Sequence, residues 1–179
     1  MTSYVAFLRG INVGGHKAIK MDALRRAFES LGYRNVRTLL ASGNVLFESR
    51  ATNPRALAKK VERRLEQVFK LEIRVVLRTR RELERLAAAD PFRGIPVTPR
   101  TRLFVTFLSQ EPRTKLKIPY VSPDKSFRIL RVANQDVCSV LTLGPQWAKN
   151  LRQMDILEKE FGKGITTRSW STMVRCLGA

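Results

Sequence analysis

A chain of 179 residues, 44% of them hydrophobic, can bury a packed core in one large domain or two small ones. Its 34 Lys and Arg against 15 Asp and Glu give a formal net charge of +19 that is spread over both halves and should attract polyanions. No run of about 18 apolar residues and no secretion signal is visible, so a cytoplasmic protein without a membrane partner is expected. An arginine-rich, solvated surface with no dedicated partner is the alternative.

The cysteines and the histidine limit the possible metal chemistry. Cys138 and Cys176 lie outside any Cys-x-x-Cys motif, and His16 is the only histidine. These residues predict neither a disulfide framework nor a multi-histidine metal site. We therefore expect reduced thiols, no metal and no cofactor, with a single bridge between the two cysteines left open.

Residues 4–78 should open with a strand, a glycine-rich loop and a helix. The apolar run 4–8 is strand-like, and the stretch 9–15 (RGINVGG) follows it directly. Apolar residues at helical spacing then predict an amphipathic helix over 21–31, and Gly32 suits its end.

The rest of this first half repeats the strand and helix pattern. The β-type runs 36–40 and 44–48 flank a turn in which Gly43 can take a positive φ. A helix over 54–69 and a strand over 73–77 follow. The order β-α-β-β-α-β is the ferredoxin-like arrangement, with antiparallel strands in the order 4-1-3-2. The fold class is therefore α+β, with residues 1–78 as the first domain.

Residues 79–179 predict a second, related α+β unit. Thr79 and Glu82 have the spacing of a capping box, which starts a helix that reaches about residue 89. A proline-rich loop, a strand over 103–108 and a hairpin formed by 127–132 and 137–143 come next.

The end of the chain predicts two helices. An apolar stripe at helical spacing ends at Gly162, and a last helix is expected with Thr167 as its N-cap. The residues of the stripe are Trp147, Leu151, Met154, Leu157 and Phe161.

The glycine-rich loop resembles a phosphate-cradling loop without matching one. Gly10 and Gly15 have P-loop spacing, but His16 and Lys17 stand where that motif needs Lys and then Ser or Thr. A plain turn is the alternative, and no catalytic signature appears elsewhere.

The helix over 54–69 carries a basic face. Like charges at i, i+4 and i+8 repel by about 0.2–0.5 kcal/mol per pair unless an anion shields them, and a polyphosphate would do so. A solvated face partly balanced by Glu62 and Glu66 is the alternative. The basic residues are Arg55, Lys59, Lys60, Arg63 and Arg64.

An RNA-binding sheet of the RRM type is not expected. The basic, glycine and aromatic order of that signature is missing around residues 44–47. Both faces of the strand 4–8 are apolar, which predicts a covered sheet that cannot stack bases.

Three runs of sequence carry a family resemblance. They are YVAFLRGINVGG from Tyr4, KMDALRRAFESLGYRNVRTLLASGNVLF from Lys20, and TTRSW from Thr166 with Ser171 and Thr172 after it. They resemble a bacterial family catalogued as domain of unknown function 1697, with residues 90–145 matching only loosely. The resemblance implies the same ferredoxin-like first half and α+β remainder, and no known biochemical role.

The carboxyl-terminal motif of that family looks like T-T-R-N-W-N-T. The positions that match it here are Thr166, Thr167, Arg168, Trp170 and Thr172. Ser169 and Ser171 stand where the family usually has asparagines, and a hydroxyl can keep a cap but not a bidentate amide contact. We expect Trp170 to anchor the last helix in the core.

The predicted topology brings two separate segments together. In a 4-1-3-2 sheet, the end of the first strand and the turn between the second and third strands share an edge, which predicts a pocket for an anion or small polar ligand. Side chains that only brace the two turns are the alternative. The candidate residues are Arg9, Gly10, Asn12, Gly14, Gly15, Lys17, Ser42, Gly43 and Asn44, with Arg168 added from the last motif.

The leading hypothesis is a binding protein for nucleic acid or a phosphate-bearing small molecule, with little sequence preference. One rival is an enzyme on a small phosphorylated or nucleotide-like substrate, with Arg9, Lys17 and Arg168 as charge clamps and no recognisable general base. Another rival is an interaction protein whose motifs are structural. The sequence does not specify an oligomeric state.

Overall fold

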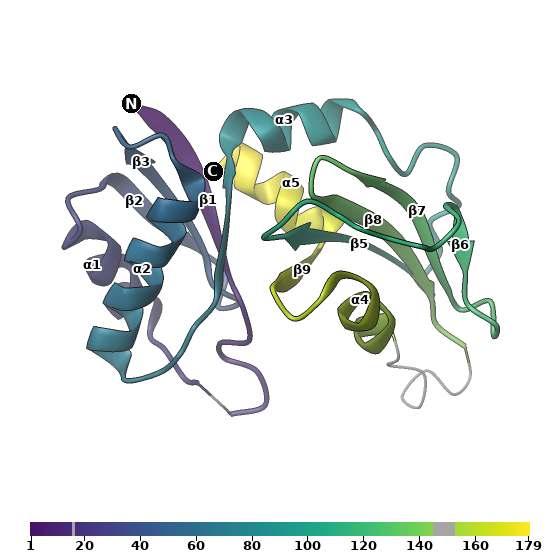
Figure 1. The fold of residues 1–179 in the computed structure, drawn as a ribbon, viewed down its shortest axis with the longest axis horizontal. Helices are drawn as coiled ribbons and strands as arrows, with labels where there is room; N and C mark the ends of the chain where they lie inside the picture. The colour runs from purple at the N-terminus through teal and green to yellow at the C-terminus, as the bar shows by residue number, and fades with distance from the viewer. Residues whose placement is uncertain (16, 145–152) are drawn as a thin grey trace. The chain divides into compact units, whose positions relative to one another are not determined.

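The computed structural model describes residues 1–15, 17–144 and 153–179 (Figure 1). His16, and Trp147 and Leu151 of the expected apolar stripe, lie outside the described residues. The chain divides into two compact units: Met1–Arg85 with Cys176–Ala179, and Leu86–Arg175. The expected domain boundary between residues 78 and 79 stays a prediction.

The first unit has the predicted ferredoxin-like order of elements. Its four antiparallel strands lie in the order β2-β3-β1-β4, and α1 and α2 cover one face of the sheet (Figure 1). The elements are β1 (Thr2–Leu8), α1 (Met21–Glu29), β2 (Arg34–Leu39), β3 (Asn44–Ser49), α2 (Pro54–Phe69) and β4 (Val75–Thr79). Strand β4 begins two residues later than expected, and Ile73, which precedes it, is buried.

The core of the first unit lies between the sheet and these two helices. Tyr4, Phe28, Tyr33 and Phe47 form an aromatic cluster within it, in which Tyr33 stacks on Phe47 with ring centroids 4.6 Å apart. Because Tyr4 and Phe47 lie beneath the helices, they cannot serve as stacking platforms for bases.

Local signals fix the ends of α2. Pro54 is its first residue, and the side chain of Asn53 accepts hydrogen bonds from the backbone N–H groups of Arg55 and Ala56, both at 3.1 Å. Lys70 ends the helix with a φ of 56°. The helix therefore has the bounds that the sequence predicts.

The second unit contains a five-stranded antiparallel sheet in the order β6-β7-β8-β5-β9. The remaining elements of the chain are α3 (Arg80–Ala88), β5 (Thr101–Leu108), β6 (Tyr120–Val121), β7 (Phe127–Ala133), β8 (Asp136–Thr142), α4 (Gln153–Phe161), β9 (Ile165–Ser169) and α5 (Trp170–Gly178). The expected hairpin is confirmed: Asn134 and Gln135 connect β7 and β8 with φ angles of 52° and 65°.

The predicted capping box at the start of α3 is confirmed. The backbone N–H of Glu82 donates to Thr79 Oγ1 (3.2 Å), and the backbone N–H of Thr79 donates to Glu82 Oε2 (2.7 Å). Each side chain thus satisfies a backbone donor that the helix itself leaves without a partner.

The predicted N-cap of the last helix is wrong. Thr167 lies inside β9, where it pairs with Thr106 of β5 and the two hydroxyl groups are 2.8 Å apart. Ser169 takes the capping role, since its Oγ accepts from the backbone N–H of Thr172 (3.2 Å). The β-branched run 165–167 favours a strand, and the sheet edge offered by β5 makes that strand possible. Strand β6, only two residues long, was also missed.

The helices in the described part of the chain include none that is both long and apolar enough to cross a membrane.

Candidate functional site

The glycine-rich loop and the β2–β3 turn lie side by side. Leu8 N–H donates to the Gly43 carbonyl (2.9 Å), and Asn12 Nδ2 donates to the Ala41 carbonyl (2.8 Å). A Cβ atom on Gly43 would lie 2.6 Å from Ile11 Cδ1, so the two segments are in direct contact. The predicted meeting of these segments at one sheet edge is confirmed.

The asparagine amides at this edge hold the loops together. Asn12 Nδ2 also donates to the Ile19 carbonyl (3.1 Å), and its Oδ1 accepts from Ile19 N–H (2.7 Å). Asn44, fully buried, donates to the Leu39 carbonyl (2.8 Å) and to Ser42 Oγ (3.1 Å). These contacts are the ones expected if the side chains only brace the two turns. Ligand binding at this edge stays a prediction.

The ammonium group of Lys17 and the backbone of Arg9 are also engaged locally. Lys17 Nζ donates to the Glu72 carbonyl (2.6 Å), and the backbone N–H of Arg9 donates to the Arg74 carbonyl (2.9 Å). Both bonds tie the loop to the segment that enters β4. The glycines predicted to line the pocket, Gly10, Gly14 and Gly15, have positive φ angles of 66°, 57° and 78°.

The carboxyl-terminal motif has a structural role within the second unit. Arg168 is buried in β9, and its Nη1 donates to Thr166 Oγ1 and to the Thr167 carbonyl, both at 2.9 Å. The side chain of Trp170 is half-buried, with its ring edge-to-face on Phe92 and the centroids 5.0 Å apart. Thr172 Oγ1 lies 2.8 Å from the capping Ser169 hydroxyl. Arg168 belongs to this second unit, whereas the other predicted pocket residues belong to the first.

A concentration of positive charge without carboxylate ion pairs lies on α2. We call its five cations the α2 face: Arg55, Lys59, Lys60, Arg63 and Arg64. Within the described ranges none of the five forms an ion pair. Glu62, one of the two carboxylates expected to balance them in part, accepts from Val75 N–H (2.9 Å) through Oε1. All but Arg64 are exposed, and Arg64 donates to Ser30 Oγ (2.9 Å).

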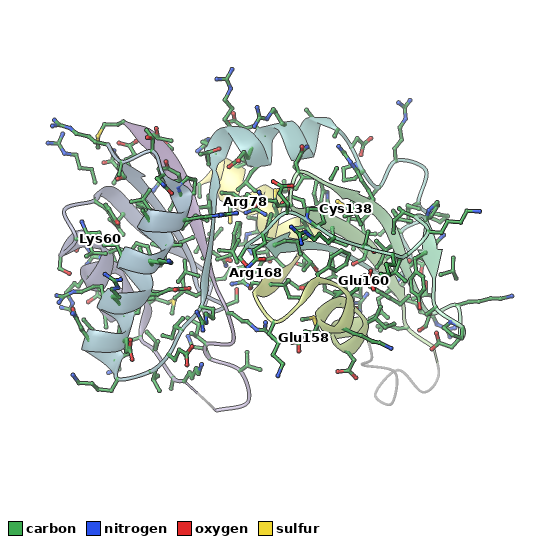
Figure 2. The ribbon with its side chains drawn as sticks, viewed as in Figure 1. Lys60, Arg78, Cys138, Glu158, Glu160 and Arg168 are labelled. Atoms are coloured by element: carbon green, nitrogen blue, oxygen red, sulfur yellow. The ribbon has the colours of Figure 1, made fainter. Side chains whose placement is uncertain are left out.

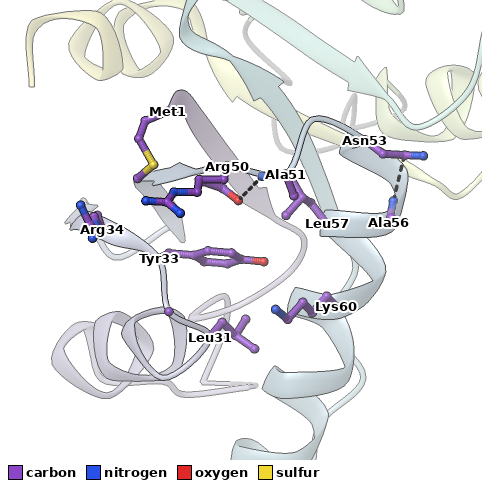
Figure 3. A pocket seen from close by; sticks show the side chains of 12 residues that line it. Met1, Leu31, Tyr33, Arg34, Arg50, Ala51, Asn53, Ala56, Leu57 and Lys60 are labelled. Atoms are coloured by element: carbon purple, nitrogen blue, oxygen red, sulfur yellow. Dashed lines mark hydrogen bonds between the residues drawn. The ribbon is translucent and has the colours of Figure 1, made fainter.

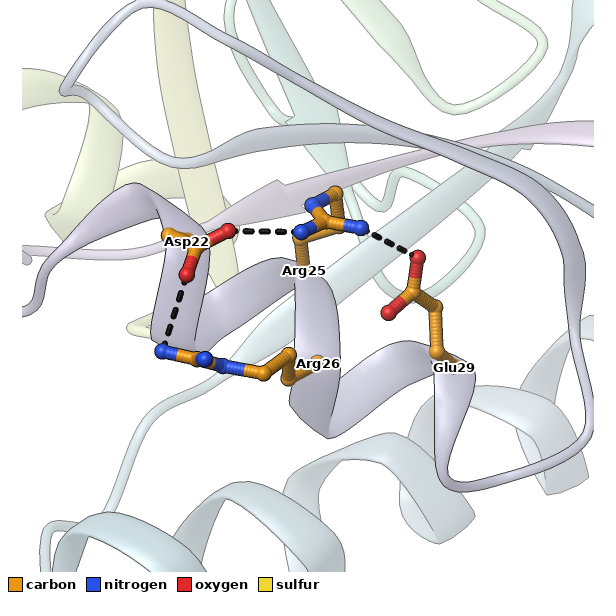
Figure 4. A network of polar contacts seen from close by, with 4 residues as sticks. All are labelled: Asp22, Arg25, Arg26 and Glu29. Atoms are coloured by element: carbon orange, nitrogen blue, oxygen red, sulfur yellow. Dashed lines mark hydrogen bonds and ion pairs between the residues drawn. The ribbon is translucent and has the colours of Figure 1, made fainter.

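The charges of α1 are arranged differently. Arg25 bridges Asp22 (2.6 Å) and Glu29 (2.7 Å), and Arg26 pairs with the second oxygen of Asp22 (2.8 Å) (Figure 4). The hydrogen bond from Arg25, together with the charge of Arg26, lowers the pKa of Asp22. The positive charge of α1 is therefore neutralised within the helix, and that of α2 is not.

Two adjoining pockets lie along the α2 face. The first has a volume of about 450 Å³ and lies between the first turns of α2 and the ends of β2 and β3 (Figure 3). The second, of about 390 Å³, shares three lining residues with the first and has no acidic lining residue. Its residues are Leu31, Ala56, Gln67 and the cations Lys59, Lys60, Arg63 and Arg64.

A third pocket, also of about 390 Å³, lies farther along α2 and has mixed charge. Glu62, Glu66 and Glu72 line it together with Lys59, Arg63 and Arg74. These carboxylates make it a poorer anion site than the other two.

Sequence reasoning did not identify Tyr33, which lines the first pocket, here called the Tyr33 pocket. Its side chain is 8% exposed, and burial raises its pKa. The ammonium group of Lys60 lies 5.7 Å from the ring centroid, within cation–π range, and Lys60 projects from α2 (Figure 2). A tyrosine directly after a helix-ending glycine carries no sequence signal for such a position.

The thiols give no sign of reactivity. Cys138 and Cys176 are buried and neither is part of a disulfide, and burial, with the nearby charge of Asp136, raises the pKa of the Cys138 thiol to about 12. Among residues 1–15, 17–144 and 153–179, no group of three or more His, Cys, Asp or Glu is placed to hold a metal ion.

Comparison with known families agrees with the sequence resemblance. The family model described as "Protein of unknown function (DUF1697)" matches residues 1–135. The chain belongs to this family. The family model covers the first two runs of resemblance, while the third run, TTRSW, lies beyond the matched residues.

No curated protein matches the chain. Among solved structures, the chain is similar to one described as that of the conserved bacterial protein SP0830 from Streptococcus pneumoniae. The two are 19% identical with a TM-score of 0.73, and the match covers 99% of this chain and 97% of that one. At this identity the likeness shows a shared fold and nothing about activity.

Proposed function

We propose that this protein binds the phosphate backbone of a nucleic acid through the α2 face, without reading its sequence. The observation that supports this proposal is the α2 face itself, five cations on one helix with no carboxylate partner in the described residues. Residues four apart rise about 6 Å along a helix, so several phosphates of one strand can be contacted at once. Neutralising phosphates releases counterions, which supplies most of the free energy of non-specific binding.

Features of the rest of the chain are consistent with this proposal. The net charge of +19 favours association with any polyanion. The aromatic residues of this sheet, Tyr4, Phe7 and Phe47, are all buried, so it offers no exposed ring on which bases could stack. The proposal includes a cytoplasmic location, which suits cysteines that form no disulfide.

The test is a fluorescence anisotropy titration of a labelled single-stranded oligonucleotide at about 50 and about 200 mM salt. Lys59→Gln with Arg63→Gln should weaken binding and reduce the slope of log K against log salt by about 1.4, since each lost single-strand phosphate contact accounts for about 0.7. The matched control is Arg25→Gln with Arg26→Gln, which removes the same net charge from cations that are already paired.

Three outcomes decide the proposal. A clear loss of oligonucleotide affinity in the double variant of α2, with little change in the double variant of α1, supports the proposal. Equal losses mean that the overall charge, and not the α2 face, drives binding. No binding by the wild-type protein at low salt rejects a nucleic-acid partner and favours an interaction protein whose motifs are structural.

A further inference from the structure

The Tyr33 pocket contains a buried polar atom without a protein partner. Tyr33 is 8% exposed, and no described residue forms a hydrogen bond with its hydroxyl group. Phe47 stacks on its ring at 4.6 Å, which fixes the ring in place. Buried polar groups nearly always have a hydrogen-bond partner, and each exception needs an explanation. A polar atom of a bound molecule would supply that partner.

The remaining lining residues define the chemistry of such a molecule. Leu31, Ala56 and Leu57 give the pocket apolar walls, and the Tyr33 hydroxyl points toward α2 (Figure 3). Arg34, Arg50 and Lys60 supply three positive charges, and none of the twelve lining residues is acidic. The pocket thus combines apolar walls, one buried hydroxyl and three cations.

We propose that the Tyr33 pocket binds one mononucleotide unit, with the nucleobase against the apolar walls and Tyr33 and the phosphate on the surrounding cations. The volume of about 450 Å³ lies within the range of small-molecule sites. The hydroxyl of Tyr33 can both donate and accept, so it can pair with polar edges of different bases.

This inference rests on the proposed function in one respect: the neighbouring second pocket on the α2 face would carry the phosphates that follow along a strand. The two pockets share Leu31, Ala56 and Lys60, so they adjoin one another. The Tyr33 pocket would then hold a single nucleotide, and the α2 face the backbone.

The test is isothermal titration calorimetry with adenosine monophosphate and, separately, with inorganic phosphate. Tyr33→Phe removes only the oxygen atom and should weaken adenosine monophosphate binding about 3- to 10-fold, the range for one hydrogen bond. Lys60→Gln should weaken it by a similar factor. Tyr120→Phe, which removes the same atom from a tyrosine that does not line the pocket, should leave it unchanged.

Several results would overturn the inference. They are no binding of adenosine monophosphate by the wild-type protein, equal affinity of the wild-type protein and Tyr33→Phe, and binding of inorganic phosphate as tight as that of the nucleotide. The last result would show that the base contributes nothing.

The Lys59→Gln and Arg63→Gln variant separates this inference from the proposed function. Neither residue lines the Tyr33 pocket, so this variant should bind adenosine monophosphate within about twofold of the wild-type protein while its oligonucleotide binding falls. If nucleotide binding depends on Tyr33 but the oligonucleotide does not bind, the pocket stands and the backbone proposal fails. If the reverse holds, only the inference about the pocket fails.

Discussion

Gly43 in the β2–β3 turn offers a direct test of the contact between that turn and the glycine-rich loop. Its φ angle of +79° costs a residue with a side chain about 1–2 kcal/mol. In Gly43→Ala the new Cβ would also lie 2.6 Å from Ile11 Cδ1 and 3.0 Å from Leu8 Cβ. Ile11 Cδ1 can move by rotation, but Leu8 Cβ is attached to β1, which pairs with a strand on each side. Overpacking of this kind adds about 1–3 kcal/mol, so we expect a total loss of about 2–5 kcal/mol of unfolding free energy.

Gly15→Ala is the matched control for this substitution. Gly15 has a φ angle of +78°, but apart from its chain neighbours no described residue has an atom within 4 Å of its new Cβ, so only the conformational cost of about 1–2 kcal/mol applies. Urea denaturation followed by far-ultraviolet circular dichroism measures both variants. Equal losses would refute the reasoning, because they would show that the turn and the loop do not press on each other at Gly43.

The remaining predictions concern the hydroxyl of Tyr33, the ring of Trp170 and the carboxylate of Glu160. Tyr33→Phe should raise the unfolding free energy by about 1–2 kcal/mol by removing a buried hydroxyl without a protein partner. Tyr4→Phe should lower the unfolding free energy by about 1 kcal/mol, since the Tyr4 hydroxyl donates to a backbone carbonyl. Urea denaturation compares the two variants, and a lower stability of Tyr33→Phe than of Tyr4→Phe would contradict both expectations. Trp170→Ala should cost about 2–3 kcal/mol, less than a fully buried ring would, and an unchanged melting temperature would assign the ring to surface binding. A hydrogen bond from Thr114 lowers the pKa of Glu160, so its stabilising effect is present above about pH 4.3 and lost as the pH falls further. Between neutral and acid pH, Glu160→Gln should lose less unfolding free energy than the wild-type protein does. Equal losses in the two proteins would mean that this hydrogen bond contributes nothing to stability.

The sequence predicts the first unit well because its signals are local and agree with one another. Helical spacing of apolar residues, Pro54 at the first position of α2 and the Thr79–Glu82 capping box each specify an element without help from distant residues. The order of those elements then implies the sheet topology, and with it the meeting of Gly43 and the glycine-rich loop.

The errors occur where distant contacts decide between two local possibilities. Thr167 can cap a helix or extend a strand, and pairing with Thr106, 61 residues earlier in the chain, selects the strand. The two-residue strand β6 has no periodicity of its own, and it exists because β7 lies beside it.

The candidate site divides in the same way. The sequence alone identifies the cations of α2, because their spacing places them on one side of a helix. Only the tertiary structure shows that Glu62 is engaged by β4 and that two pockets adjoin the cations of α2.

What the sequence determined by itself is the fold class, the element order of the first half and the basic character of α2, since composition, periodicity and capping are properties of neighbouring residues. What only the tertiary structure decided is which polar groups have partners. Asn12 and Asn44 are used by their own loops, whereas the hydroxyl of Tyr33 has no protein partner among the described residues. Such partners come from segments far apart in the chain, and no local pattern encodes them.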